Sequence, residues 1–107
     1  MSKFMVVLYR RPDLTVAQFR RHLEEVHAPL AKVLPGLKGY KQNHASEDHQ
    51  RRHPDWDAIV ELYFENRESM DAAWATPQGA ASDADLPLFA DLTRTTWSVV
   101  DEATLLL

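Results

Sequence analysis

The chain is predicted to form an α+β domain of the ferredoxin-like βαββαβ type, with a four-stranded antiparallel sheet. Two helix-forming stretches separate four strand-forming stretches in that order. The first and third strands, Lys3–Arg10 and Trp56–Glu65, are rich in apolar residues, as central strands of this topology should be. The other two, Leu37–Ala45 and Arg94–Glu102, carry the polar residues expected at sheet edges. With 107 residues, 45% of them hydrophobic, one domain over residues 1–107 is expected.

The segment Thr15–Gly36 is predicted to be an amphipathic helix. Its apolar residues recur at steps of three and four and form one stripe, which comprises Val16, Phe19, Leu23, Val26, Leu30 and Leu34. Thr15 and Gln18 have the spacing of a capping box. Pro29 lies inside the helix and lacks the amide donor that a helix uses, so we expect a kink or break near His27.

Polar and helix-breaking residues divide the rest of the chain. The most polar stretch, Ser46–Asp55, is predicted to be a long exposed loop. Asn66 is expected to cap a helix over Arg67–Ala75. Pro77 is expected to interrupt the helical region, and the alanine-rich stretch Gln78–Asp91 is expected to form a weaker helical piece that is broken again at Pro87.

A four-stranded sheet with both helices on one side leaves its other face open. Because the two central strands are apolar on both faces, we expect a cover for that open face. The simplest cover is the sheet of a second copy, which predicts a homodimer. The last five residues, ATLLL, are also apolar and exposed unless something covers them.

Composition argues against several classes of protein. The formal charge is −4 and the basic residue pairs are scattered, so a nucleic-acid partner is not expected. Cysteine is absent, which removes disulfides, thiolate metal sites and cysteine nucleophiles, and suits a reducing cytoplasm. The apolar run near the amino terminus is too short for a signal peptide or a membrane span. A cytoplasmic protein without a membrane partner is therefore expected.

Five segments of the chain carry a resemblance to a known family. They are VVLYRRP, FRRHLEEVHAPLA, PGLKGYKQNH, AIVELYFE and FADL. In this order and spacing they resemble the EthD-type family of dimeric α/β-barrel proteins. The resemblance implies a homodimer in which two ferredoxin-like sheets meet, with a pocket in each subunit between sheet and helices. Relatives of this fold include cofactor-independent isomerases, cyclases, decarboxylases and oxygenases of aromatic or lactone compounds, and haem-handling proteins. Such an analogy does not fix a reaction.

His27 is the first candidate for chemistry, because it matches the helix-one histidine of the family and borders the apolar stripe. An imidazole there can accept and return a proton without a cofactor. The alternative is a structural histidine that bonds a carbonyl freed by Pro29. Strand alternation places Tyr40, Gln42 and His44 on one face, where they can orient and polarise a carbonyl or lactone. The alternative there is a polar edge strand that faces water.

Other candidates are ranked by their neighbours. His53, next to Pro54, can act as a lid over a pocket mouth or lie solvated in its loop. His22 and His49 have polar neighbours and are expected in solvent. The predicted catalytic residues are therefore His27, Tyr40, His44 and His53, and the predicted substrate-binding residues are Tyr9, Gln42, Trp56, Tyr63 and Trp74.

The sequence favours an enzyme without cofactor. The predicted helix carries no H-x-x-x-H pair, and His49 and His53, which have that spacing, lie in a predicted loop, so no metal site is expected. The leading hypothesis is a homodimeric enzyme that isomerises, dehydrates or decarboxylates a small aromatic or lactone compound through a proton shift. One alternative is a non-catalytic small-molecule-binding or accessory protein of an oxidative system for ether or aromatic degradation. Another is a haem-binding monooxygenase with His27 or His44 as axial ligand.

Overall fold

The computed structural model describes residues 1–107 and has the predicted βαββαβ order. Its elements are β1 (Ser2–Leu8), α1 (Val16–His22), the π-helical turn η1 (Leu23–His27), α2 (Ala28–Ala31), β2 (Leu37–His44), β3 (Ala58–Phe64), α3 (Arg67–Trp74), α4 (Pro77–Asp85), the 3₁₀ turn η2 (Leu86–Leu88) and β4 (Thr96–Val100). The strands form one antiparallel sheet in the order β2-β3-β1-β4. The predicted ferredoxin-like fold is confirmed, with the two most apolar strands in the centre.

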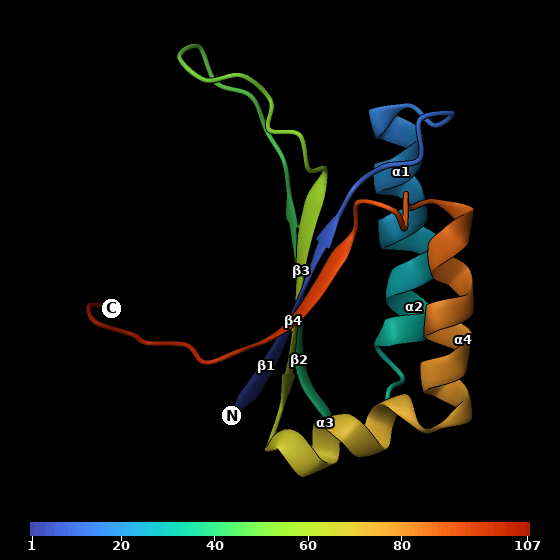
Figure 1. Cartoon of the computed structure of the whole chain (residues 1–107), viewed down its shortest axis with the longest axis vertical. Coiled ribbons are helices and arrows are strands. Elements are labelled where there is room, and N and C mark those ends of the chain that lie inside the picture. The colour runs from blue at the N-terminus through green and yellow to red at the C-terminus, as the bar shows by residue number, and fades with distance from the viewer.

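All helices lie on one side of the sheet. Figure 1 shows the sheet nearly on edge, with α1, α2 and α4 packed on one side and α3 across the end. The loop between β2 and β3 and the carboxyl-terminal segment both project on the opposite side. No helix combines the length and the hydrophobicity needed to cross a membrane.

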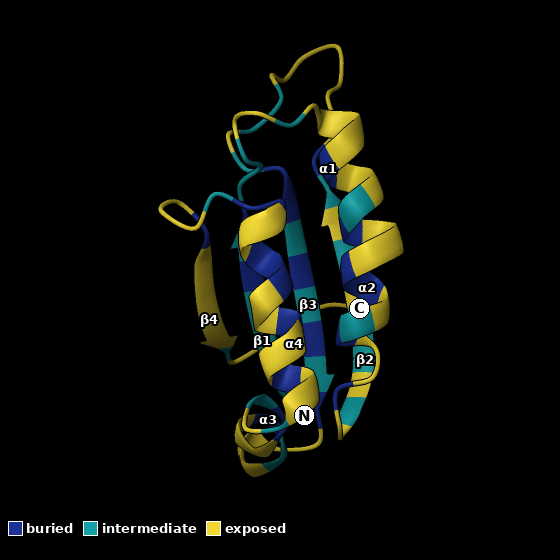
Figure 2. Ribbon diagram, turned by 90° about the vertical axis from the view of Figure 1, so that its right-hand side faces the viewer, coloured by how far each residue is buried: buried dark blue, intermediate teal, exposed yellow.

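The core lies between the sheet and the helices. Along β3, side chains alternate between buried and half-buried, which agrees with the predicted period of two. Figure 2 shows this alternation, and it shows buried residues along α4 as well. The largest fully buried side chains come from distant segments and include Phe19, Phe64 and Phe89. The rings of Phe19 and Phe89 pack with centroids 5.6 Å apart.

Helix starts follow the predicted capping residues. Thr15 Oγ1 accepts a hydrogen bond from the Gln18 N–H at 3.1 Å, and the Thr15 N–H donates to Gln18 Oε1 at 2.8 Å, which completes the capping box. The Asn66 side chain accepts from the Ser69 N–H at 2.8 Å. Pro77 was expected only to interrupt a helix, but it opens α4, where a missing N–H costs nothing.

The predicted long helix is interrupted near the predicted place, but by a widened turn. Over Leu23–His27 the backbone is π-helical, and the Ala28 N–H donates to the Leu23 carbonyl five residues back. Each π turn holds more residues than an α turn, so the inward face moves along the sequence. Val26 is consequently 46% exposed and His27 only 7% exposed. The regular stripe was therefore wrong at Val26, and His27 lies in the core instead of at its margin. It was also wrong at Val16, which is 43% exposed at the start of α1.

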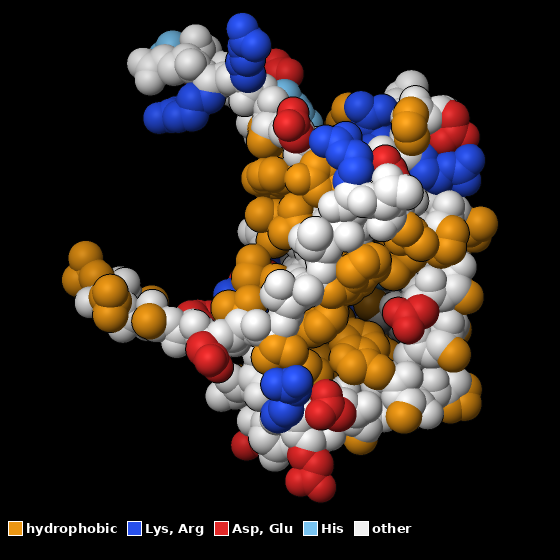
Figure 3. All heavy atoms as spheres, in the orientation of Figure 1, with side chains coloured by type: hydrophobic (Ala, Val, Ile, Leu, Met, Phe, Trp, Pro, Cys, Tyr) orange, Lys and Arg blue, Asp and Glu red, His pale blue; other side chains and the backbone are white.

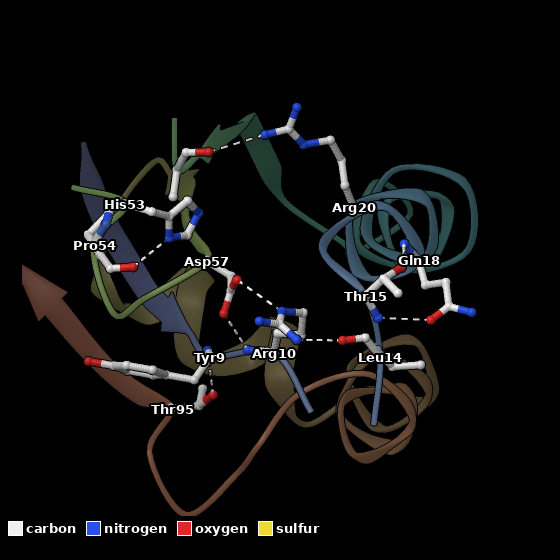
Figure 4. Close-up of polar contacts among 11 residues, drawn as sticks. Tyr9, Arg10, Leu14, Thr15, Gln18, Arg20, His53, Pro54, Asp57 and Thr95 are labelled. Carbon is white, nitrogen blue, oxygen red and sulfur yellow. Dashed lines mark hydrogen bonds and ion pairs between the residues drawn. The ribbon is translucent and has the colours of Figure 1, made fainter. Parts of the chain in front are cut away.

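A buried carboxylate ties the central strands to the start of α1. Asp57 accepts hydrogen bonds from the Arg10 backbone N–H at 2.8 Å and from Arg10 Nε at 3.3 Å. The Asp57 N–H donates to the Leu8 carbonyl at 2.8 Å, and the Arg10 guanidinium also bonds the Leu14 carbonyl. Figure 4 shows Arg10 between Asp57 and Leu14. This cluster holds the end of β1, the entrance to β3 and the approach to α1 together.

Replacing Asp57 with alanine should lower the free energy of unfolding by about 1–3 kcal/mol, because Arg10 would lose both bonds to the carboxylate. Urea unfolding followed by circular dichroism measures the change. Asp55→Ala, in the exposed loop just before, is the matched control and should unfold like the wild type. Equal losses in both variants would contradict the structural role of Asp57.

Candidate functional site

A largely apolar pocket of about 440 Å³ lies between the sheet and the helices. Of its 14 lining residues, 11 are hydrophobic, and Figure 3 shows a hollow among hydrophobic side chains between the two layers. The lining comprises Phe4, Val6, Leu8, His27, Ala31, Tyr40, Val60, Leu62, Trp74, Ser82, Asp83, Leu86, Leu92 and Trp97. An uncharged ligand with a large apolar surface fits such a lining.

His27 is the histidine that lines this pocket. Its Nδ1 lies 2.9 Å from Oδ2 of Asp85, a residue that is only 6% exposed. A carboxylate only accepts, so the His27 Nδ1–H donates and Nε2 keeps a free lone pair. Burial lowers the pKa of His27, and the hydrogen bond and charge of Asp85 oppose that shift in part. The imidazole is thus neutral at neutral pH and able to accept a proton.

The widened turn places His27 in the pocket. Pro29 offers no N–H to the carbonyl of Glu25, and its ring would clash with that carbonyl in a regular helix. The turn just before Pro29 widens instead, and His27 becomes an inward residue. The Leu23 carbonyl of the same turn also accepts a hydrogen bond from Gln42 Nε2 at 3.0 Å.

Besides Ser82 and Asp83 of α4, Tyr40 brings a hydroxyl group to the pocket lining. Its hydroxyl oxygen accepts a hydrogen bond from Gln42 Nε2 at 2.9 Å, which leaves the O–H free to donate. Burial raises the pKa of Tyr40, so the side chain remains a neutral phenol. Gln42 does not line the pocket but connects the phenol to the widened turn. His27 and Tyr40 therefore line one pocket, whereas Gln42, which was predicted to bind substrate, contacts Tyr40 and Leu23 instead.

Sequence reasoning missed Asp85 and misplaced His22. His22 was expected in solvent, but its side chain is only 22% exposed and its Nε2 lies 3.0 Å from both carboxylate oxygens of Asp85. One signal was available for Asp85: Gly79, Ser82 and Asp85 are spaced by three, so they share one face of α4. That face is buried against the core.

His44 and His53 lie outside the pocket. His44 shares a face of β2 with Tyr40, as predicted, but its Nε2 pairs with Glu24 at 3.1 Å. Burial and the charge of Arg20 lower the pKa of His44. His53 stays in the loop, where its Nδ1 lies 2.6 Å from the Pro54 carbonyl, as Figure 4 shows.

Of the predicted aromatic binding residues, Trp74 lines the pocket and three do not. Tyr63 lies on the opposite face of the sheet, because it alternates with the inward-facing Leu62. The Arg94 guanidinium lies over the ring of Tyr9 at 4.3 Å. Trp56 is half-buried before β3 begins. No cluster of three or more histidine, aspartate or glutamate side chains is arranged to hold a metal ion.

Comparison with known proteins finds a family match over most of the chain. Residues 11–93 match the EthD domain family. A curated protein of Rhodococcus erythropolis, an uncharacterized 11.0 kDa protein in the thcB-thcC intergenic region, is 28% identical over 86 residues, which span 80% of this chain and 82% of that protein. The crystal structure of an ethyl tert-butyl ether d (EthD) family protein from Bacillus halodurans has 28% identity and a TM-score of 0.80, over 96% of this chain and 100% of that one.

More distant structures share the fold. A dimeric protein of unknown function with a ferredoxin-like fold, from Bacteroides fragilis, has 13% identity and a TM-score of 0.65, over 94% of this chain and 93% of that one. SnoaB, a cofactor-independent oxygenase from Streptomyces nogalater, has 11% identity and a TM-score of 0.65, over 95% of this chain and 92% of that one. At these identities the similarity shows the fold alone.

The lowered pKa of His27 predicts how stability depends on pH. Folded His27 has a pKa below the ordinary value of 6.5, so below that pH the unfolded chain binds the proton more readily. The free energy of unfolding should therefore fall as the pH drops below 6.5. In His27→Gln it should fall less steeply, by up to about 1.4 kcal/mol per pH unit. Urea titrations between about pH 7.5 and 5.5 measure both slopes.

His49→Gln, which removes an exposed loop histidine, is the control and should follow the wild type. If His27→Gln and the wild type have the same slope, the pKa of buried His27 is not lowered.

Proposed function

The chain belongs to the EthD family, and we propose that it is an enzyme that moves a proton on a small aromatic or lactone-type compound. His27 is the general base and acid, Asp85 positions it, and Tyr40 donates a hydrogen bond to a substrate oxygen. The reaction class is isomerisation, dehydration or decarboxylation by a proton shift, with no cofactor.

One observation carries this proposal: an imidazole lines an apolar pocket while a buried carboxylate holds its other nitrogen. Asp85 selects the Nδ1–H tautomer, which directs the basic Nε2 away from the carboxylate. It also stabilises the imidazolium that forms when Nε2 takes a proton. An apolar lining strengthens both effects, because little water screens them.

The proposed isomerisation conserves every atom. His27 Nε2 removes a proton from a substrate carbon next to a carbonyl, and the electrons of that C–H bond move onto the carbonyl oxygen. The Tyr40 O–H donates to this oxygen, where negative charge develops. The His27 imidazolium then returns the proton to a different atom, and the carbonyl re-forms. In dehydration the same enolate would expel a β-hydroxyl group, which leaves as water with the proton of the His27 imidazolium. In decarboxylation the loss of carbon dioxide from a β-carboxylate would itself form the enolate, and a protonated His27 would then donate a proton to the carbon.

The second candidate is a protein that binds such a compound without changing it. The observation that favours it is the lining, in which 11 of 14 residues are hydrophobic and only one is a histidine. The two candidates differ in whether proton transfer to and from His27 converts the bound compound into a product. The similarity to SnoaB indicates only that this fold also houses cofactor-independent chemistry.

A base in an apolar pocket should accelerate proton removal from 5-nitrobenzisoxazole. Loss of its C–H proton breaks the ring N–O bond and releases a coloured cyanophenolate, so the rate is read by absorbance without knowledge of the natural substrate. His27→Gln should lower kcat/KM by about 100-fold or more, because the base is gone. Tyr40→Phe should lower it by about 10-fold, because the developing phenolate loses a donor.

His53→Gln is the control, since His53 lies in the loop, and should retain the wild-type rate. If the wild type is no faster than buffer but still binds the compound, the non-catalytic candidate replaces the enzyme.

We further propose that the protein is a homodimer through the outer face of its sheet. That face carries the half-buried apolar side chains of Met5, Val7 and Ile59 beside an ion pair of Lys3 and Glu61 with an N···O distance of 2.6 Å. The loop before β3 and the carboxyl-terminal segment project on the same side, and in Figure 3 they bound a concave surface. The structurally similar Bacteroides fragilis protein is dimeric.

Ile59→Glu should convert the dimer to a monomer, because each copy would bury an unpaired carboxylate in the proposed interface. Sedimentation velocity at micromolar concentration measures the mass. Val33→Glu, on the helix side and already 60% exposed, should leave the dimer intact. A wild-type protein that sediments as a monomer would contradict the proposed interface.

A further inference from the structure

Outside the pocket, a second histidine contacts the carboxylate that holds His27. We propose that His22 is a positioning residue, which fixes the Asp85 carboxylate and thereby holds His27 in the Nδ1–H tautomer. This inference rests on the proposed role of His27 as the base.

Asp85 is shared by two imidazole rings. Its Oδ2 lies 2.9 Å from His27 Nδ1, and both of its oxygens lie 3.0 Å from His22 Nε2. No lysine or arginine pairs with this buried carboxylate, so its hydrogen-bond donors are the two rings. Because a carboxylate only accepts, His22 donates from Nε2 and His27 from Nδ1.

The imidazole rings of His22 and His27 both pack on the phenyl ring of Phe89. The His22 ring stacks on Phe89 with centroids 4.6 Å apart and an interplanar angle of 23°. The His27 ring packs on the same phenyl ring with centroids 5.1 Å apart at 50°. His22 therefore cannot turn away from Asp85 without losing an aromatic contact, and a carboxylate held by two rings has little freedom to rotate.

His22 acts on the pocket only through Asp85. It lines a separate shallow hollow on the outside of the helices, with Arg21 and Glu25 as its charged neighbours, and it is absent from the pocket lining. Facing His27 are the carboxylates of Asp85 and Asp83, both from α4. A positive charge on His22 lowers the pKa of His27, whereas the two carboxylates raise it. His22 thus contributes a fixed donor and, when it is protonated, a charge that acts on His27.

These two contributions can be separated by substitution. His22→Gln keeps an N–H donor for Asp85 but cannot carry a charge. His22→Phe keeps an aromatic ring against Phe89 but removes the donor and the charge. With the donor removed, the carboxylate can rotate and His27 can exchange tautomers, whereas loss of the charge alone makes His27 easier to protonate.

The test is the ¹⁵N spectrum of the imidazole nitrogens, recorded on the full chain as a function of pH. Wild-type His27 should show one Nδ1–H tautomer. In His22→Gln the tautomer should persist while the titration midpoint of His27 moves to higher pH. In His22→Phe the midpoint should also rise, and signals of both tautomers should appear. His49→Gln, which removes an exposed loop histidine, should match the wild type in both respects.

An unchanged tautomer and midpoint in a folded His22→Phe variant would overturn the proposal. If that variant does not fold, a single unchanged tautomer in His22→Ala, which also removes the donor, has the same consequence. A purely structural His22 would lower the melting temperature and leave both spectral readouts unaltered. The spectra need no substrate, so they are independent of the 5-nitrobenzisoxazole rates. The spectra can confirm the positioning role of His22 while the rates contradict the proposed enzyme. Equally, the rates can support the enzyme while the spectra contradict the role of His22.

Discussion

The arrangement of the pocket depends on one constraint, the missing backbone N–H of Pro29. A regular helix cannot pass this residue without a clash at the carbonyl of Glu25, and the turn before it is π-helical. That turn directs His27 inward, and its Leu23 carbonyl accepts a hydrogen bond from Gln42, which also bonds the Tyr40 hydroxyl. The widened turn thus directs His27 into the pocket and is hydrogen-bonded, through Gln42, to the Tyr40 hydroxyl.

Tertiary packing brings Asp85 and Phe89, which are distant in the sequence, against the histidines of the site. Asp85 comes from the end of α4, and Phe89 from the segment just after it, yet both contact the histidines of the first helical region. A buried carboxylate needs donors, and two imidazole rings supply them without a permanent countercharge. The contacts that orient His27 therefore also hold α4 against the first helical region, α1 and η1.

Most of the fold follows from local patterns in the sequence. The period of two in β3, the apolar centre of the sheet and the cap at Thr15 are all present as predicted. The candidate site was harder to predict from the sequence. A period of 3.6 cannot reveal a widened turn, so Val26 was placed inside and His27 at the margin. The contact of Asp85 with His22 depends on how α4 packs on α1, about which neither segment carries information by itself.

His27, and not Val26, faces inward from this helix, and this has a cost in stability. Its apolar residues suit a regular helix, in which the valine would be covered and the imidazole would face water. Burying a valine side chain typically contributes about 1.5 kcal/mol, and that contribution is given up where Val26 stays exposed. Recovering it would require a regular turn, which Pro29 opposes through its clash with the Glu25 carbonyl. A covered Val26 and an inward His27 are thus alternatives that differ by one residue of register.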